Sequence, residues 1–240
     1  MRTAYTVFRN LYNVRKMTMK LVLASGSQRR RELLTMCGYD YEIIVSNADE
    51  TIDENDPESF VRALSFRKAK DVFDRLFAAG RRDFAVIGSD TVVAFQKDGG
   101  TKPVIIGKPK DAEDAVRILS MLSGKTHRVF TGVSVIADIP DENAAAQCSI
   151  RKKEEIQTEC SITEVTFETL SPDEITDYVN SGDPLDKAGS YGIQGPFGMF
   201  VREIRGNYFT VIGMPIPVLY KMLKKIGILP HGFLRTYRIE

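Results

Sequence analysis

Short hydrophobic segments alternate with amphipathic segments along the chain, a pattern typical of an α/β protein. Residues 84–95 are almost continuously apolar, which predicts a strand buried on both faces. Residues 20–24 predict a shorter apolar strand, and the alternation over residues 41–45 predicts a second one. Further strands are expected within residues 128–137 and 162–170, and residues 208–227 predict a strand, a turn and a helix in succession.

Four further helices can be placed from their start and stop residues. Their expected starts carry residues that accept hydrogen bonds from a first helical turn, and glycine is expected where the backbone must turn left-handed. The helices are expected after Ser27, after Asp56 with Pro57 in the first position, within residues 107–124 and after Ser171, with Gly38 and Gly124 ending the first and third.

Two segments are expected to lie outside regular structure. Residues 138–160 are polar and predict a solvated excursion between strands, and the glycine-rich residues 181–200 predict a long ordered loop. No internal repeat and no Pro/Ser-rich linker divides the chain. One α/β unit, with two lobes around a cleft, is therefore expected.

The N-terminus differs from the rest of the chain because it has no acidic residue before Glu32 and several basic ones. This composition resembles a mitochondrial presequence, which would take the protein to that organelle. The alternative is an unstructured extension, or translation upstream of a functional start at Met17 or Met19. The absence of serine favours this alternative. Residues 1–18 are therefore treated as an extension, residues 19–240 as the domain, and the cytoplasm as the expected location.

Composition narrows the classes of partner. The formal net charge of the 240-residue chain is +1, so no global field attracts a nucleic acid polymer or an anionic membrane. Three cysteines without CxxC or CxxH spacing favour a reducing compartment and argue against a structural zinc site. No apolar run is long enough to span a bilayer.

Positive charge at the start of the first helix is unusual. Gln28, Arg29, Arg30 and Arg31 occupy its expected first turn, where the helix dipole favours anions. One interpretation is that the long arginines bend back into solvent at small cost. The other is that an anion such as a triphosphate binds there, since a helix N-terminus preceded by Gly26 is already an anion site. The sequence pattern leaves both open.

Four more charged residues stand where packing alone would not place them. Asp90 interrupts the apolar strand, and Lys68 lies on the apolar stripe of its helix, either snorkelling or aimed into a cleft. Lys108 lies between a glycine and a proline, and Glu50 follows a strand. Each has an ordinary explanation as a turn or solvated residue. Together, however, cations for phosphates and carboxylates for a divalent metal are the inventory of phosphate-ester cleavage.

Several longer motifs resemble the Maf family of nucleoside triphosphate pyrophosphatases and occur in the same order. They are "LVLASGSQRRRELL", "GSDTVV", "GKPKDAEDAVRILSMLSGKTHRVFTGV", "PLDKAGSYGIQG" and "VIGMP", spanning residues 20–225. The resemblance implies an α/β fold with a mixed twisted sheet in two lobes around a deep cleft, related to inosine triphosphate pyrophosphatases. It also implies cleavage between the α and β phosphates with a divalent cation (Mg²⁺, Mn²⁺ or Co²⁺).

The resemblance also implies residue roles. Asp90 matches the catalytic residue, usually assigned as proton acceptor, and whether it acts as a base or as a metal ligand stays open. Arg29, Thr91 and Gln194 match positions tied to substrate choice. The other expected substrate-binding residues are Ser25, Arg30, Lys68 and Lys108, and the expected metal ligands are Glu50 and Asp90.

The segment "YGIQG" resembles the branch that hydrolyses dTTP and UTP, and modified pyrimidine nucleotides are further expected substrates. A homodimer would be ordinary for the family. A different class, a nucleotide-binding regulator of cell division without turnover, would carry the same charged residues. Two positions depart from the family pattern, Gln28 in place of proline and Thr210 in place of asparagine.

Overall fold

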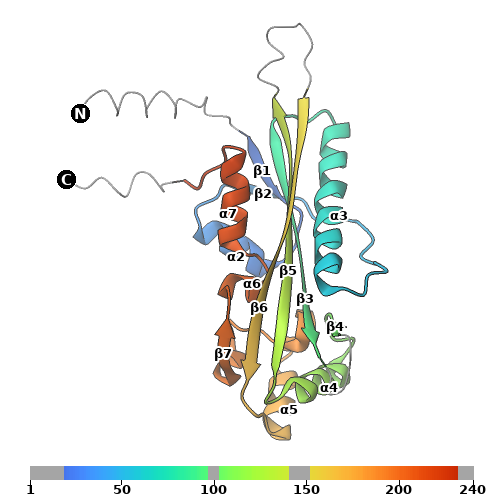
Figure 1. The fold of residues 1–240 in the computed structure, drawn as a ribbon, viewed down its shortest axis with the longest axis vertical. Coiled ribbons are helices and arrows are strands. Elements are labelled where there is room, and N and C mark those ends of the chain that lie inside the picture. The colour runs from blue at the N-terminus through green and yellow to red at the C-terminus, as the bar shows by residue number, and fades with distance from the viewer. Residues whose placement is uncertain (1–18, 97–102, 141–151, 232–240) are drawn as a thin grey trace, which may run out of the picture.

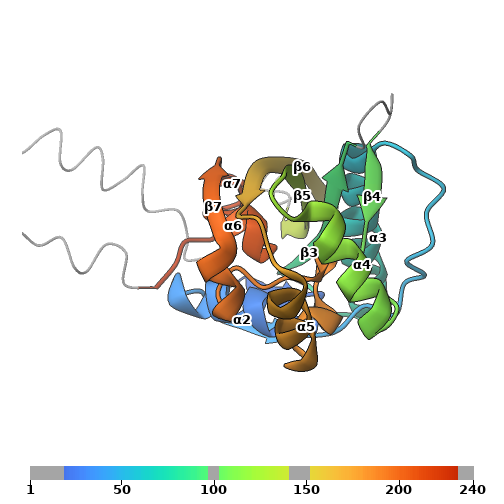
Figure 2. The ribbon, with the colours of Figure 1, turned by 90° about the horizontal axis from the view of Figure 1, so that it is seen from below.

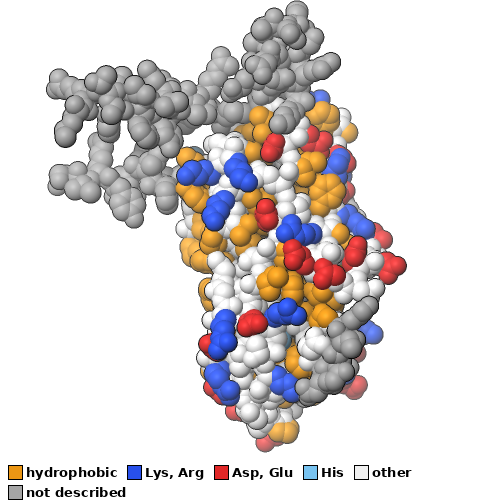
Figure 3. Space-filling view, viewed as in Figure 1, with side chains coloured by type: hydrophobic (Ala, Val, Ile, Leu, Met, Phe, Trp, Pro, Cys, Tyr) orange, Lys and Arg blue, Asp and Glu red, His pale blue; other side chains and the backbone are white. Residues whose placement is uncertain are grey.

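The computed structural model describes residues 19–96, 103–140 and 152–231 (Figure 1). The extension expected at residues 1–18 lies outside them. Within the described part of the chain, no helix is both long enough and apolar enough to cross a membrane. On the face shown in Figure 3, basic and acidic side chains are interspersed, with no large area of one sign.

A seven-stranded mixed sheet forms the centre of the molecule, which confirms the predicted fold class. Its order is β2-β1-β3-β5-β6-β7, and β4 pairs with β3. β1 is parallel to β2 and β3, and the other neighbours are antiparallel. The strands are β1 (Lys20–Leu23), β2 (Tyr41–Ile43), β3 (Phe84–Phe95), β4 (Val104–Ile106), β5 (Thr126–Pro140), β6 (Lys152–Phe167) and β7 (Val201–Arg205).

Helices cover both faces of this sheet. The α-helices are α2 (Gln28–Met36), α3 (Pro57–Ala78), α4 (Ala112–Leu122), α5 (Pro172–Asn180), α6 (Tyr208–Ile212) and α7 (Ile216–Lys225). α3 packs one face through Ala69, Val72 and Phe73, and α2 and α7 pack the opposite face, as Figure 2 shows from below. α4 and α5 enclose a separate apolar cluster at the other end of the long strands. The two lobes thus share β3 and β5.

The expected helix ends are confirmed. Asp56 accepts a hydrogen bond from the amide of Ser59 at the start of α3, and Ser171 forms a capping box with Glu174 at the start of α5. Gly38 follows α2 with φ of 75°, a left-handed conformation that suits glycine. Ser27 stands at the N-cap position of α2 but makes no side-chain capping bond.

The prediction of a solvated excursion over residues 138–160 is wrong at both of its ends. β5 continues to Pro140 and β6 begins at Lys152, and the two strands pair as far as Pro140 with Lys152. Polar residues are tolerated because pairing satisfies their backbone groups while their side chains face water or one another. The hydroxyls of Ser134 and Thr158, for example, are 2.9 Å apart across the pair.

The strand predicted at the start of residues 208–227 is also wrong, because Tyr208–Ile212 forms the short helix α6. Asn207 accepts a hydrogen bond from the amide of Phe209, and Gly213 ends the helix with φ of 113°. These end residues outweigh the β propensity of the segment between them. β4 and β7 were not predicted, and the glycine-rich loop contains three short 3₁₀ helices, η2 (Asp183–Asp186), η3 (Ala188–Ser190) and η4 (Pro196–Phe200).

The outer edge of β3 is paired in two separate places. β1 pairs with residues 84–87, and β4 pairs with residues 93–95. Between these ranges, no described strand pairs with that edge of β3. Side chains near Asp90 and Thr91 therefore border an opening in the sheet, on the strand that both lobes share.

Candidate active site

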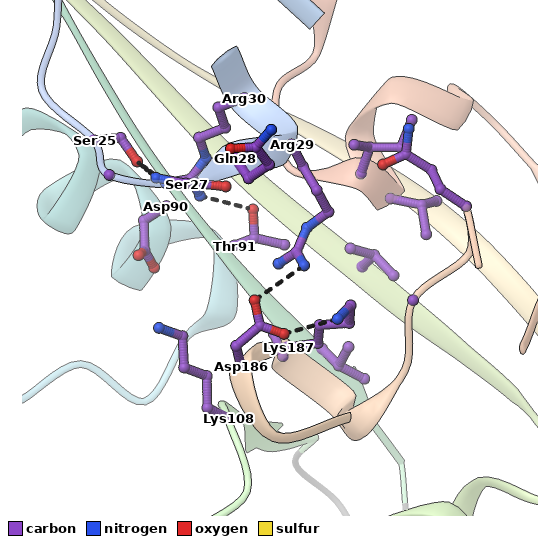
Figure 4. Close-up of a pocket in the computed structure, with 18 of the residues that line it drawn as sticks. Ser25, Ser27, Gln28, Arg29, Arg30, Asp90, Thr91, Lys108, Asp186 and Lys187 are labelled. Atoms are coloured by element: carbon purple, nitrogen blue, oxygen red, sulfur yellow. Dashed lines mark hydrogen bonds and ion pairs between the residues drawn. The ribbon is translucent and has the colours of Figure 1, made fainter. Parts of the chain in front are cut away.

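All nine side chains predicted from the sequence line one cavity of about 490 Å³. The cavity lies at the opening beside β3, and Figure 4 shows many of its lining residues. They come from the β1–α2 connection, the first turn of α2, the loop after β2, α3, β3, the loop after β4 and the loop after η3. They are Ser25, Arg29, Arg30, Glu50, Lys68, Asp90, Thr91, Lys108 and Gln194.

The N-terminus of α2 opens into this cavity. Gly26, Ser27 and Gln28 line it, and the first turn of the helix contains no acidic residue. Arg29 does not bend away into bulk solvent, because its side chain is only 27% exposed and also lines the cavity. This geometry favours the anion-binding interpretation of the basic first turn.

Arg30 is fixed by three hydrogen bonds. Its Nε donates to the carbonyl of Gly213 at 2.8 Å, its Nη1 to Ser25 Oγ at 3.1 Å and its Nη2 to Thr91 Oγ1 at 3.4 Å. Burial lowers the pKa of the Arg30 guanidinium, and the nearby Asp90 carboxylate acts in the opposite direction. The cavity thus contains a partly buried guanidinium held by three hydrogen bonds, whose charge is balanced mainly by Asp90.

Lys68 joins the two acidic residues. Its Nζ lies 2.8 Å from Asp90 Oδ1 and 2.9 Å from Glu50 Oε1. The Lys68 and Asp90 side chains are 11% and 12% exposed. The lysine is therefore aimed into the cleft, and the carboxylate within the apolar strand has a charged partner, as a buried charge requires.

Two glycines allow α3 to approach the sheet closely enough for this contact. A Cβ atom at Gly88 would lie 2.1 Å from the carbonyl oxygen of Ser65, and one at Gly132 would lie 2.1 Å from that of Val61. Gly132 is also the cross-strand partner of Asp90. Backbone contact between helix and strands therefore sets the distance that the Lys68 side chain must span.

Thr91 belongs to a chain of hydroxyl groups behind Arg30. Its Oγ1 lies 3.0 Å from that of Thr131, which donates to the carbonyl of Thr210 at 2.7 Å. Thr210 is fully buried, and its own hydroxyl lies 2.7 Å from Ser161 Oγ. Threonine at this departure from the family pattern is thus fully accommodated by hydrogen bonds.

The loop that carries Glu50 is tied to α3. Arg67 Nη1 donates to the carbonyl oxygens of Asp49 and Thr51, both at 2.8 Å. Asp71 accepts from Ser46 Oγ at 2.9 Å. The two residues that flank Glu50 are therefore clamped to the same helix that carries Lys68. Sequence reasoning missed Arg67 because its partners are backbone carbonyls, 16 and 18 residues earlier in the chain, which no side-chain pattern reveals.

Asp186 and Lys187 also line the cavity and were missed, although they lie within the motif "PLDKAGSYGIQG". Asp186 Oδ2 is 3.3 Å from Arg29 Nη1, and its Oδ1 is 2.7 Å from Lys187 Nζ (Figure 4). The adjacent opposite charges of Asp186 and Lys187 in a glycine-rich segment were the available sequence signal. Lys108 also points into the cavity, from the side opposite α2 (Figure 4).

An apolar wall borders the cavity near η3. It includes Val93 and its cross-strand partner Val129, together with Tyr191. Behind this wall, His127 Nε2 lies 3.0 Å from the hydroxyl of Tyr191. Burial lowers the pKa of His127 to about 3, so this histidine is neutral and supports the wall without charging it.

Comparison with known proteins agrees with this geometry. The family model described as "Maf-like protein" matches residues 20–226. A dTTP/UTP pyrophosphatase of Agathobacter rectalis is 40% identical over 217 residues, covering 87% of this chain and 98% of that protein. A dTTP/UTP pyrophosphatase of Bacillus thuringiensis subsp. konkukian is 42% identical over 210 residues, covering 87% and 96%.

Among solved structures, that of the Staphylococcus aureus Ham1 protein matches with a TM-score of 0.43 and 15% identity, covering 86% of this chain and 98% of that one. This similarity is too low to indicate an activity. The match to the family model and the relatives above 30% identity, in contrast, extend over most of the chain. The protein is therefore a member of the Maf family, as its motifs indicated.

Proposed function

We propose that the protein hydrolyses nucleoside triphosphates between the α and β phosphates, releasing a nucleoside monophosphate and pyrophosphate. The observation that carries the proposal is the convergence of Arg30, Lys68 and Lys108 with Asp90 and Glu50 in one cavity. A triphosphate needs several fixed cations, and its hydrolysis needs a group that accepts a proton from water.

The polyphosphate is expected to lie at the charged end of the cavity. Free amides at the start of α2 and the partly buried guanidinium of Arg30 bind phosphate oxygens. Lys108 approaches from the opposite side and offsets charge on the departing pyrophosphate. Asp90 accepts the proton of the attacking water while the α–β anhydride bond breaks, and Lys68 holds the carboxylate in position.

Glu50 and Asp90 are the residues that would hold a divalent cation. The described residues contain no group of three or more His, Cys, Asp or Glu side chains able to bind a metal ion. Two carboxylates fit a magnesium-type ion, which is usually bound by one or two carboxylates together with substrate phosphates. Such an ion would neutralise phosphate charge as a Lewis acid.

The proposed substrates are dTTP and UTP, the nucleotides in the names of the relatives. The apolar wall at Val93, Val129 and Tyr191 suits a planar base. Gln194 lies on the loop that follows this wall and offers both a donor and an acceptor to the edge of a pyrimidine.

Pyrophosphate release from a panel of nucleotides, with Mg²⁺, Mn²⁺ or Co²⁺ present, tests the proposal. Asp90→Asn is expected to abolish turnover and to retain dTTP binding, because the amide keeps the size of the carboxylate but cannot take the proton. Asp177→Asn on the exposed side of α5 is the matched control and should turn over normally. Nucleotide binding by the wild type without any pyrophosphate release would refute the enzyme assignment and favour a non-catalytic regulator.

A further inference from the structure

Lys187 lines the cavity, but its ammonium is already saturated by protein groups. Nζ donates to the carbonyl oxygen of Asp183, to Asp183 Oδ1 at 2.9 Å and to Asp186 Oδ1 at 2.7 Å. An ammonium has three protons, so none remains for a phosphate in this arrangement. The side chain is only 12% exposed. Lys187 therefore acts as a support for the two aspartates.

The support extends to the loop that carries Gln194. The Tyr178 hydroxyl donates to Asp183 Oδ2 and accepts from the amide of Gly192 at 3.0 Å. A Cβ atom at Gly192 would lie 2.7 Å from Lys187 Cε, so the loop packs directly on this lysine. One network thus fixes the path of the chain just before Gln194.

Asp186 extends the same network to Arg29. Burial raises the pKa of Asp186, but hydrogen bonding to Lys187 and the charge of Arg29 outweigh it, and the pKa lies below its usual value. In Figure 4 the side chains of Arg29 and Arg30 diverge, Arg30 toward Ser25 and Thr91 and Arg29 toward Asp186. Two neighbouring arginines are therefore directed to different parts of one cavity.

A carboxylate beside a polyanion weakens phosphate binding, so its presence in this cavity calls for another explanation. Asp186 stands two residues before Ala188, which lines the cavity at η3. At the next residue, a Cβ atom on Gly189 would lie 2.6 Å from Val93 Cγ2, so η3 packs on the apolar wall. Asp186 therefore lines the cavity on the segment that leads directly into the apolar wall, and through it Arg29 is directed toward the side where the base is expected.

The hydrogen-bonding groups at the edge of the base explain why an arginine would be placed at this end of the cavity. A guanidinium only donates hydrogen bonds, whereas the Gln194 amide can donate or accept by turning over. Thymine presents an oxygen acceptor at position 4, and cytosine presents an amino donor there. Arg29 at the base edge therefore favours a 4-oxo pyrimidine and opposes cytosine, a distinction that Gln194 alone does not make.

We propose that Asp186, held by Lys187, is a positioning residue that keeps the Arg29 guanidinium at the base end of the cavity, where it selects thymine and uracil nucleotides over cytosine nucleotides. This inference rests on the proposed function and concerns its substrate specificity. An isolated exposed ion pair would contribute little, but this carboxylate is anchored on its other oxygen by a nearly buried lysine.

The test compares dTTP with dCTP, which have rings of equal size and opposite hydrogen-bonding groups at position 4. Asp186→Asn is expected to lower the ratio of kcat/KM for dTTP to that for dCTP by about tenfold, the factor expected for one charged hydrogen bond. Arg29→Gln should lower it similarly, and the double variant should lower it no further. Asp186→Glu should restore part of the ratio, and Asp177→Asn should leave it unchanged.

The ratio of kcat/KM for dTTP to that for dCTP distinguishes a loss of Arg29 positioning from a general loss of structure, since misfolding lowers kcat/KM for both nucleotides together. An unchanged ratio in Asp186→Asn, or effects of Asp186→Asn and Arg29→Gln that multiply in the double variant, would overturn the inference. Dissociation constants of the two nucleotides, measured by calorimetry on the same proteins, give the same ratio without turnover. A wild type that discriminates in binding but releases no pyrophosphate would refute the proposed function and leave this inference standing.

Discussion

Replacement of Gly132 by alanine tests how the active site is assembled. The added methyl group would lie 2.1 Å from the carbonyl oxygen of Val61 and 2.5 Å from its carbon, where an ordinary contact is at least 3.4 Å. The obstacle is backbone of α3, which cannot rotate away as a side chain can. The helix must therefore retreat from the sheet by more than about 1 Å.

The displacement has two expected costs. Overpacking of this kind lowers the free energy of unfolding by about 3 kcal/mol, at the upper end of its usual range because backbone must move. Lys68 lies on the displaced helix and Asp90 is the cross-strand partner of Gly132. A displacement of about 1 Å in such a pair lowers kcat by about 10²-fold.

Urea unfolding and steady-state pyrophosphate release measure the two effects. Gly107→Ala is the matched control for stability, because a Cβ atom there meets nothing within 4 Å and its φ is not positive. Gly88→Ala should behave like Gly132→Ala, since its methyl group would meet Ser65 of the same helix. Wild-type stability and activity in Gly132→Ala would refute the idea that backbone contact positions Lys68.

Three further changes have defined outcomes. Lys68→Met should lower kcat by about 10²-fold, as loss of one preorganised charge does. Lys70→Met removes a pair with Asp74 and a contact with the Phe73 ring, both away from the cavity, and should keep kcat. Equal rates in the two variants would contradict the role of Lys68. Arg67→Gln should speed amide hydrogen exchange over residues 46–52 and raise the half-saturating Mn²⁺ concentration, whereas Arg62→Gln on the same helix should change neither. Burial lowers the pKa of His127 from 6.5 to about 3, so between these values the unfolded chain binds a proton that the folded protein does not, and stability falls as the pH drops below 6.5. Unfolding in urea at pH 7 and pH 5 should show about 2 kcal/mol less acid destabilisation in His127→Phe than in the wild type, and equal losses would show that His127 is not the group responsible.

Much of the site was predictable because its residues break local patterns. Asp90 interrupts a buried apolar strand, and Lys68 occupies an apolar position of a helix. Such exceptions are visible within one element and do not depend on the fold. The helix ends at Asp56 and Ser171 were predictable for the same reason, since capping involves only neighbouring residues.

What escaped prediction depends on partners distant in the sequence. Asp186 pairs with Arg29, which lies 157 residues earlier, and no local pattern indicates this pairing. β6 looks solvated because its polar side chains face water, although its backbone is paired with β5. The segment Tyr208–Ile212 has strand-like composition and is helical because of its end residues.

The residues around the opening beside β3 differ in how freely they can be replaced, because some belong to the sheet and others to a connecting segment. Asp90 sits on a strand embedded in the sheet, so altering its surroundings disturbs the packing of both lobes. Gln194 and Asp186 belong to a connecting segment of short turns, whose replacement leaves the strands intact. With the roles proposed above, a change in the choice of nucleotide can therefore be made in this segment without disturbing the strand that carries Asp90.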